Sequence, residues 1–590
     1  MVKHYKTVHI FLALFLLALV FSCRKEEQHV ISILGTTDLH GVISPYDFIE
    51  KEKLNASLAG ISAYIAKTRK ESDELILLDN GDNLQGQPSV YYYNFIDTVT
   101  PHFLAEAMNW LKYDACTIGN HDLEAGHSVY DRLVNDYNFP LLAANAVDIK
   151  TGKPYFKPYA IIEREKVKIA VLGLITPAVP TWLPEKLYSG IEFRDMVETA
   201  ESWMPEIRRQ KPDLIIGLFH SGWNSDNEEY KKTEKLNENG SAAVAYNVPG
   251  FDIIFTGHDH RLANEKFINK NGDTILIMNA GSRSENLARA DVKFTTIKGR
   301  SKRQKSISGK IIDIKDYKPD PVFVSHFKSY SNQVNEYVNK VIGNSVASIS
   351  SRDSYFGSSS FVDMIHSIQL EITGADISFA APLSFDVSIR KGPVTVGDMF
   401  KLYRFENMLY TISMTGDEIS DYLEFSYGEW LSTMTDPDDY LLNYRLGKNG
   451  KPVLTNGKAW LQNQPYNFDS AAGIDYIVDA RLPEGERVTI ISFTDGRPFD
   501  REKRYKVALN SYRGNGGGGH LTRGAGLKNN QIRERLLTST DRDLRYFIMK
   551  SIEARKIIEP VPLNNWKIIP EAWVGKARTR EQLLLFGATK

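Results

Sequence analysis

Short apolar runs alternate with amphipathic stretches through the first half of the chain. The runs are rich in Val, Ile and Leu, and they are Val30–Leu34, Leu75–Leu78, Lys168–Leu174, Leu214–Phe219, Ile253–Phe255 and Ile275–Met278. Continuous apolar runs of this length are typical of strands that are buried on both faces, with helices between them. The pattern predicts a layered α/β domain, which we bound at residues 24–315 together with the polar segment before its first strand.

The pattern changes after this domain. Apolar positions recur with helical spacing within residues 316–345, which predicts a linker helix. Beyond it the apolar runs are shorter and turn residues are more frequent, so we expect an α+β domain over residues 346–570 and a tail over residues 571–590. The segment Ser360–Asp363 has the pattern of a capping box, and the helix that it opens is expected to end at Gly374.

The N-terminus has the pattern of an export signal. Residues 1–23 place two lysines before an apolar core that is too short to span a membrane, since a spanning helix needs about 20 apolar residues. The core ends in Val20-Phe21-Ser22-Cys23, which resembles a bacterial lipobox, whose cysteine becomes lipidated. We expect an exported lipoprotein, attached through Cys23 to a bacterial envelope membrane at its periplasmic face or at the cell surface. The alternative is an uncleaved anchor helix.

Composition changes the picture mainly by exclusion. The 590 residues exceed one typical domain. With 72 Lys+Arg against 73 Asp+Glu the net charge is -1, which argues against a nucleic-acid polymer as partner, because such binders usually have a basic excess. Two Cys residues exclude a Cys₄ zinc site and a disulfide scaffold. If Cys23 is lipidated, Cys116 is the only thiol left. Nothing predicts an obligate protein partner.

Polar residues that can bind metals follow five strand-like runs. They are Asp38, His40, Asp82, Asn120, His220, His258 and His260. The carboxyl ends of parallel strands meet at one edge of a sheet, so we expect these side chains to lie close together. A set of Asp, Asn and His without Cys suits Mn, Zn, Fe or Co. Seven ligands are too many for one ion, so two divalent ions that share a carboxylate are expected. A single Asp or His at a strand end is usually a cap, but five such coincidences are not.

The order of these motifs resembles that of the calcineurin-like metallophosphoesterases. The motifs are DLHG at 38–41, GDN at 81–83, GNHD at 119–122, a single His after a strand, and GHDH at 257–260. The resemblance implies a four-layer α/β/β/α domain. It also implies how the ligands divide: Asp38, His40, Asp82 and His260 would hold the first metal, and Asp82, Asn120, His220 and His258 the second. Catalysis by two metals needs no nucleophilic side chain.

Two further residues acquire roles from the same resemblance. His121 would sit over the substrate phosphate, where it would stabilise developing charge or protonate the leaving oxygen. Glu124 would orient His121, although the family more often has Asp at that place. His127 matches no motif position and is expected to be a surface residue.

Motifs in the second half resemble the nucleotide-binding domain of the secreted 5'-nucleotidase / 2',3'-cyclic phosphodiesterase family. They are GADISFAAP at 374–382, YRFENMLY at 403–410, YNFD at 466–469 and NSYRGNGGGG at 510–519. The resemblance implies that Tyr466 and Tyr512 stack on the base, with Phe468 as a competitor for the first place. Asn407 and Arg513 would be polar contacts to the nucleotide substrate. Stacking of this kind is worth about 1–3 kcal/mol per base.

The branch of the family follows from smaller features. Residues 382–390 lack the glycine run that 5'-nucleotidases usually carry, while YNFD, NSYR and NNWK at 564–567 look like the bifunctional 2',3'-cyclic nucleotide 2'-phosphodiesterase / 3'-nucleotidase branch. We therefore expect an enzyme of that branch, acting outside the cytoplasm. Alternatives are a 5'-nucleotidase or UDP-sugar hydrolase-like enzyme of the same family, a hydrolase of thiosulfonate esters, and a non-catalytic nucleoside-binding lipoprotein.

Overall fold

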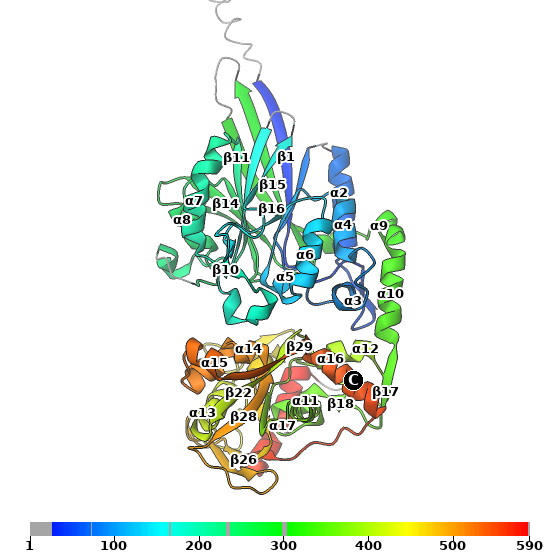
Figure 1. Cartoon of the computed structure of the whole chain (residues 1–590), viewed down its shortest axis with the longest axis vertical. Helices are drawn as coiled ribbons and strands as arrows, with labels where there is room; N and C mark the ends of the chain where they lie inside the picture. Colours follow the sequence, from blue (N-terminus) through cyan, green and yellow to red (C-terminus); the bar gives the residue numbers. More distant parts are fainter. Residues whose placement is uncertain (1–25, 72–73, 165–166, 232–235, 298–303, 588–590) are drawn as a thin grey trace, which may run out of the picture.

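The computed structural model describes residues 26–71, 74–164, 167–231, 236–297 and 304–587. The predicted signal peptide and Cys23 lie outside these residues, so the lipoprotein remains a prediction. Within the described segments no helix is both long and apolar enough to cross a membrane. Figure 1 shows two halves placed one above the other along the longest axis, with α10 (Lys328–Asn339) running along one side between them.

Two six-stranded sheets form the centre of the first half. The first has the order β16 (Gln304–Asp313), β15 (Asn286–Ile297), β1 (Glu26–Thr36), β4 (Leu75–Asp79), β5 (Ala115–Thr117), β6 (Leu141–Leu142). The second has the order β13 (Leu262–Ile268), β14 (Thr274–Ala280), β12 (Ile253–Thr256), β11 (Leu214–His220), β9 (Val167–Ile175), β8 (Tyr159–Arg164). The parallel pairs β1–β4, β4–β5, β9–β11 and β11–β12 bring the carboxyl ends of these strands together.

The apolar runs are continuous because each strand is covered on both faces. Alternate residues such as Ile33 and Ile76 point between the two sheets. Their neighbours Leu34 and Leu77 pack against helices on the outer face of the first sheet, α2 (Leu58–Glu71), α4 (Phe103–Leu111) and α6 (His127–Asp136). Helices α7 (Met196–Arg209) and α8 (Ser241–Asn247) cover the second sheet. This order of helix, sheet, sheet and helix confirms the expected four-layer α/β/β/α domain.

The second half is an α+β domain, as predicted. Its main sheet has the order β25 (Ser470–Ala472), β19 (Ile377–Ala380), β28 (Arg504–Asn510), β22 (Met408–Thr415), β29 (Leu536–Asp543). Only β19 and β28 run parallel; the other pairs are antiparallel. Helices α11 (Ser360–Thr373), α13 (Gly416–Trp430) and α16 (Leu544–Arg555) pack around it.

Three local expectations differ from the structure. The linker consists of two helices, α9 (Pro321–His326) and α10, that meet at Phe327. Helix α11 does end at Gly374, which has a left-handed conformation, but Ser359 rather than Ser360 precedes it and no side chain caps it. Asp363 accepts hydrogen bonds from Ser358 and Leu563 instead, so the predicted capping box is wrong.

The expected tail is a packed helix. Residues from 571 onward form α17 (Glu571–Phe586), which buries Val574, Ala577 and Leu585 in the core of the second half. Glu581 is fully buried on the same helix and accepts hydrogen bonds from the backbone N–H groups of Leu441 and Leu442. A buried carboxylate with two such donors is stabilised where it would otherwise be costly.

A tyrosine of the first half lies inside the core of the second. Tyr91, on α3 (Pro88–Phe95), is fully buried among side chains of α12 (Val396–Leu402) and α16. Its ring centre lies 5.3 Å from that of Phe400, at right angles, and 5.0 Å from the Arg545 guanidinium. Its hydroxyl donates to Oδ2 of Asp543 at 3.1 Å. The two halves are therefore joined by a packed contact as well as by the linker.

Replacing Tyr91 by Ala should lower the free energy of unfolding by about 3–5 kcal/mol, because it removes a buried aromatic ring and leaves a cavity. Tyr91→Phe keeps the ring and loses one hydrogen bond, so about 1 kcal/mol is expected. Urea unfolding followed by tryptophan fluorescence measures both changes. Equal stability of Tyr91→Ala and the unchanged chain would contradict the contact.

Candidate metal centre and substrate pocket

The backbone at the strand ends has an uncommon conformation. Five candidate ligands have left-handed φ angles: Asp38 (51°), His40 (48°), Asp82 (58°), His258 (73°) and His260 (56°). Residues other than glycine rarely adopt such angles, and the strain persists only where the surrounding structure enforces it. Strain of this kind gathers at functional sites, so its concentration here marks this edge of the sheets as the candidate site.

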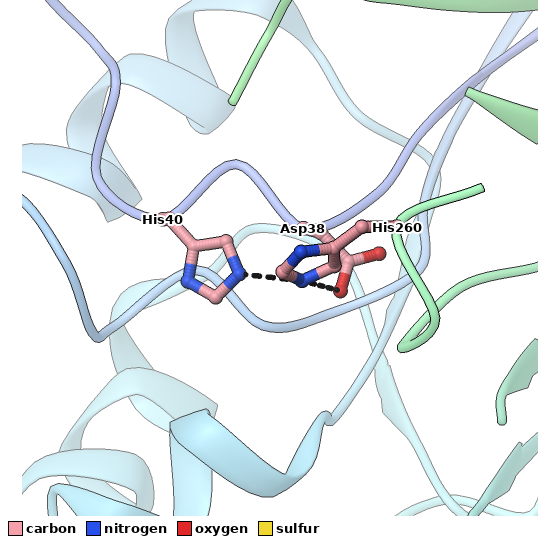
Figure 2. Close-up of side chains that lie close together, drawn as sticks. All are labelled: Asp38, His40 and His260. Atoms are coloured by element: carbon pink, nitrogen blue, oxygen red, sulfur yellow. Dashed lines mark hydrogen bonds and ion pairs between the residues drawn. The ribbon is translucent and has the colours of Figure 1, made fainter. Parts of the chain in front are cut away.

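The first cluster consists of Asp38, His40 and His260. Nε2 of His260 lies 3.0 Å from Nε2 of His40 and 3.3 Å from Oδ1 of Asp38, and Figure 2 shows the three side chains converging. Nδ1 of His40 lies 2.9 Å from the carbonyl oxygen of Gln85, which can only accept, so Nδ1 is the protonated nitrogen. Burial and the neighbouring His121 lower the pKa of His40 to about 4. His40 is thus neutral, with Nε2 free to bind a cation.

The second cluster consists of Asp82, His220 and His258, with Asn120 between them. Oδ1 of Asn120 lies 3.2 Å from Nε2 of His220 and 2.8 Å from Nδ1 of His258. Nε2 of His220 lies 3.1 Å from Oδ2 of Asp82, while Nδ1 donates to the carbonyl oxygen of Asn80 at 2.6 Å. Burial alone would raise the pKa of Asp82, but His220 and His121 outweigh it and hold that pKa well below its usual range.

The two clusters fit a pair of divalent cations. In each of them the three Asp and His ligand atoms lie within 4.8 Å of one another. Oδ2 of Asp82 is buried without an aligned hydrogen-bond donor, and its neighbour at 3.1 Å is Nε2 of His220, so a cation beside these two atoms would satisfy both. The donors are imidazole nitrogens and carboxylate or amide oxygens, which suit borderline divalent ions. All seven predicted ligands therefore lie together.

His121 and Glu124 form a pair beside the clusters, on α5 (Asn120–Glu124). Nδ1 of His121 lies 2.7 Å from Oε2 of Glu124, and the His121 ring centre lies 5.5 Å from that of His40. Burial would lower the pKa of His121, but the carboxylates of Glu124 and Asp82 outweigh it and raise that pKa to about 10. His121 is a charged proton donor at neutral pH in this arrangement.

Asp122 is a supporting residue that the sequence analysis missed. Its carboxylate accepts hydrogen bonds from the backbone N–H groups of Asp82, Asn83, Leu84 and Gly119, at 2.8–3.0 Å. It thereby ties the loop after β4 to the loop after β5. Gly119 permits this close approach, because a Cβ atom there would collide with Oδ1 of Asp82. Its place in the sequence could have indicated this role, because Asp122 ends the GNHD motif and lies beside the candidate ligands.

A cavity of about 290 Å³ opens next to the second cluster, and both halves of the chain line it. The lining residues are Asn120, His121, Glu124, Trp182, Leu183, Glu238 and His258 from the first half, and Leu383, Phe405, Asn407, Tyr466, Asn510 and Tyr512 from the second. Three predicted substrate contacts, Tyr466, Tyr512 and Asn407, are among them. Trp182, Leu183, Glu238, Leu383, Phe405 and Asn510 were not predicted, since they lie outside the site motifs or were given no role within them.

The two tyrosine rings do not face each other. Their centres lie 6.5 Å apart and the ring planes meet at 86°. Phe405 stands at 82° to Tyr466, with 6.0 Å between centres. A flat ligand stacked on one tyrosine would meet the edge of the other, so the expected parallel sandwich is not formed in this arrangement.

Two other predicted substrate contacts are wrong. Phe468 is fully buried and stacks on Trp430 with 5.0 Å between ring centres, so it belongs to the core. Arg513 is 1% exposed, and its guanidinium donates to both oxygens of Asp469, at 2.9 and 3.1 Å, and to the carbonyl oxygen of Tyr466 at 2.7 Å. Arg513 therefore holds the Tyr466 loop in place and does not line the pocket.

Each half of the chain is similar to a known protein family. Residues 31–262 match the calcineurin-like phosphoesterase family, and residues 325–523 match the 5'-nucleotidase C-terminal domain. The chain is 24% identical over 620 residues to the 2',3'-cyclic-nucleotide 2'-phosphodiesterase/3'-nucleotidase of Haemophilus influenzae, covering 93% of this chain and 89% of that protein. It is 27% identical over 604 residues to the trifunctional nucleotide phosphoesterase protein YfkN of Bacillus subtilis, covering 92% of this chain and 39% of that protein.

Among solved structures, the 5'-nucleotidase precursor from Thermus thermophilus has the same fold. The TM-score is 0.59 at 19% sequence identity, over 92% of this chain and 100% of that chain. At this identity the likeness concerns the fold alone.

Proposed function

Because the chain joins a calcineurin-like phosphoesterase domain to a 5'-nucleotidase C-terminal domain, we propose that it hydrolyses phosphate esters of nucleotides at two divalent metal ions. The observation that carries the proposal is the shared cavity. One wall holds His121, Asn120 and His258 beside the metal clusters, and the other holds Tyr466 and Tyr512. A substrate that fills it has a phosphate at one end and a flat apolar group at the other, as nucleotides do.

The candidate residues fall into metal ligands, a proton donor and its orienting partner. Asp38, His40 and His260 would hold one cation, His220, His258 and Asn120 the other, and Asp82 would contact both. Bound there, the two cations would polarise the phosphate and activate a water. His121 would act beside them as a charged donor that stabilises the phosphate oxygens and protonates the leaving oxygen. Glu124 would orient the His121 ring and stabilise its charge through Nδ1.

We propose that the substrates are those of the 2',3'-cyclic nucleotide 2'-phosphodiesterase / 3'-nucleotidase branch. The name of the Haemophilus relative, which this chain matches over most of its length, supports it. So does the segment 382–390, which lacks the glycine run that 5'-nucleotidases usually carry. The other candidate activity within the family is that of a 5'-nucleotidase. No described residue of the pocket favours it specifically.

One assay tests both levels of the proposal. Phosphate release is measured from adenosine 2',3'-cyclic phosphate, 3'-AMP and 5'-AMP, each in Mn, Zn and Co buffers. For the cyclic substrate, opening of the ring is also followed directly, without a coupling phosphatase. We expect turnover of the cyclic and 3' substrates. Preference for 5'-AMP would overturn the branch, and no turnover of any nucleotide would overturn the function. A parallel panel of thiosulfonate esters would reveal the alternative hydrolase.

We also propose export and lipid attachment at Cys23, on the lipobox-like sequence alone. Replacing Cys23 by Ser should move the protein from the detergent phase to the aqueous phase in Triton X-114 partition and abolish labelling with a palmitate analogue. The buried Cys116 is the control, because Cys116→Ser should leave both readouts unchanged. Equal partition of the Cys23→Ser variant and the unchanged chain would contradict the anchor.

A further inference from the structure

A carboxylate stands on the pocket wall between the second cluster and the aromatic rings. Glu238 belongs to the loop between β11 and α8, and 51% of its side chain is exposed. Its Oε1 lies 3.0 Å from Nε2 of His258, and it lines the cavity together with Trp182 and Tyr512. It belongs to none of the motifs and has no part in the reaction described above.

The loop places Glu238 firmly. Ser221 is buried and directly follows His220 in the sequence. Its hydroxyl donates to the carbonyl oxygen of Glu238 at 2.7 Å and accepts from the N–H of Gly240 at 2.8 Å. The side chain of Asn239 occupies space that is open only because Gly222 has no Cβ atom. The backbone at Glu238 is therefore tied to the end of β11, and its carboxylate reaches His258 from there.

The pocket has an unusual charge for an anionic substrate. Among the described residues that line it, none is Lys or Arg, whereas Glu124 and Glu238 both carry carboxylates. Arg513, whose guanidinium lies 5.4 Å from the Tyr512 ring centre, is paired with Asp469. Burial chiefly raises the pKa values of Tyr466 and Tyr512; Arg513 opposes the rise at both rings, and Glu238 adds to it. Positive charge in the pocket is confined to the metal end and His121.

We propose that Glu238 is a specificity-determining residue that restricts the pocket to substrates with a single phosphate group. The inference rests on the proposed hydrolysis of nucleotides and names a substrate class within it: nucleoside monophosphates whose other ribose positions are uncharged. A second phosphate on the nucleoside would lie near the Glu238 carboxylate, and no Lys or Arg among the described lining residues would offset the repulsion. A ribose hydroxyl at the same place can instead donate a hydrogen bond to that carboxylate.

The test compares substrates that differ by one phosphate. The pairs are 3'-AMP with adenosine 3',5'-bisphosphate, and 5'-AMP with ADP, so that either branch of the family provides a usable pair. Glu238→Gln keeps an acceptor oxygen for His258 and removes the charge, and Glu238→Lys reverses it. The preference for the monophosphate, as a ratio of kcat/KM values, should fall about tenfold in Glu238→Gln and further in Glu238→Lys.

Controls separate charge from position. Glu201 is exposed on α7 outside the pocket, so Glu201→Gln should leave the ratio unchanged. Raised ionic strength should lower the kcat/KM preference of the unchanged chain for the monophosphate more than that of Glu238→Gln. The reason is that only the unchanged chain has the Glu238 charge for salt to screen. Bound metal is measured in every variant by inductively coupled plasma mass spectrometry.

Two results overturn the inference without touching the function. The first is an unchanged ratio in Glu238→Gln and Glu238→Lys. The second is an equal loss of activity on both members of a pair that tracks a loss of bound metal, which would make Glu238 only an orienting partner of His258. If the unchanged chain hydrolyses no nucleotide, the proposed function fails. The pairs are then compared by calorimetric binding to the metal-loaded protein, where equal affinities overturn the inference by itself.

Discussion

Asp82→Asn should lower kcat/KM for a nucleotide substrate by about a thousandfold or more, because it removes the negative charge that both clusters share. Asp82 is 1% exposed, its Oδ1 accepts the N–H of His121 at 2.8 Å, and its Oδ2 faces His220. Asn offers only one acceptor oxygen and no charge, so metal affinity should fall together with kcat. Initial rates at saturating metal, with metal content measured on the same samples, give both quantities.

The matched control is Asp316→Asn, since Asp316 is exposed at the end of a short helix away from the clusters. It should have unchanged rates and metal content. Circular dichroism shows whether each variant is folded. A folded Asp82→Asn variant with full activity and two bound metals would contradict the assignment of Asp82 as the shared ligand.

His121→Ala should lower kcat by about 10²–10⁴-fold with a smaller change in KM, as expected for loss of a general acid. Glu124→Gln gives a finer test through pH. Activity that needs charged His121 is lost as pH rises through the His121 pKa, and Glu124 holds that pKa high. Gln removes the carboxylate, so the alkaline limb of the kcat profile should move to lower pH. Bound cations push the same pKa downward, so the two profiles are compared at equal metal content.

Glu124→Asp separates the charge from the reach of the side chain. It keeps the carboxylate but shortens it by one methylene, so its alkaline limb should lie closer to that of the unchanged chain than the limb of Glu124→Gln does. Superimposable profiles for all three proteins would show that Glu124 does not set the pKa of His121.

The metal end of the site could be predicted because two regular features coincide. Apolar runs mark the strands, and parallel strands must end at one edge, so polar residues that follow several runs are brought together whatever the loops do. The seven candidate ligands and His121 are of this kind. Asp122 was within reach of the same reasoning, since it stands in the same motif.

For the side of the pocket formed by the second half, the sequence indicated the right segments but not which side chains face the cavity. Tyr466 and Phe468 are two residues apart, yet one lines the pocket and the other stacks on Trp430 in the core. The segment is a short 3-10 turn, η6 (Pro465–Asn467), in which no periodicity tells which side chain faces inward. Glu238 and Trp182 lie in irregular loops, where position depends on contacts with distant parts of the chain.

The last helix was missed for a related reason. Its apolar residues are interrupted by Glu581, an ionisable residue that is nevertheless buried, so the pattern looks too polar for a packed helix. The partners that make this burial acceptable are backbone groups at Leu441 and Leu442, about 140 positions earlier in the chain. Patterns along a local window contain no sign of such partners.

The burial of Tyr91 bears on how the chain can be divided. A first half produced alone would present this ring, and the face of α3 around it, to water. A second half produced alone would open the site between Phe400 and Arg545 that the ring fills. Each fragment would carry a matching apolar patch, so fragments should associate with each other or precipitate. The two halves together are therefore the unit that we expect to be stable in solution.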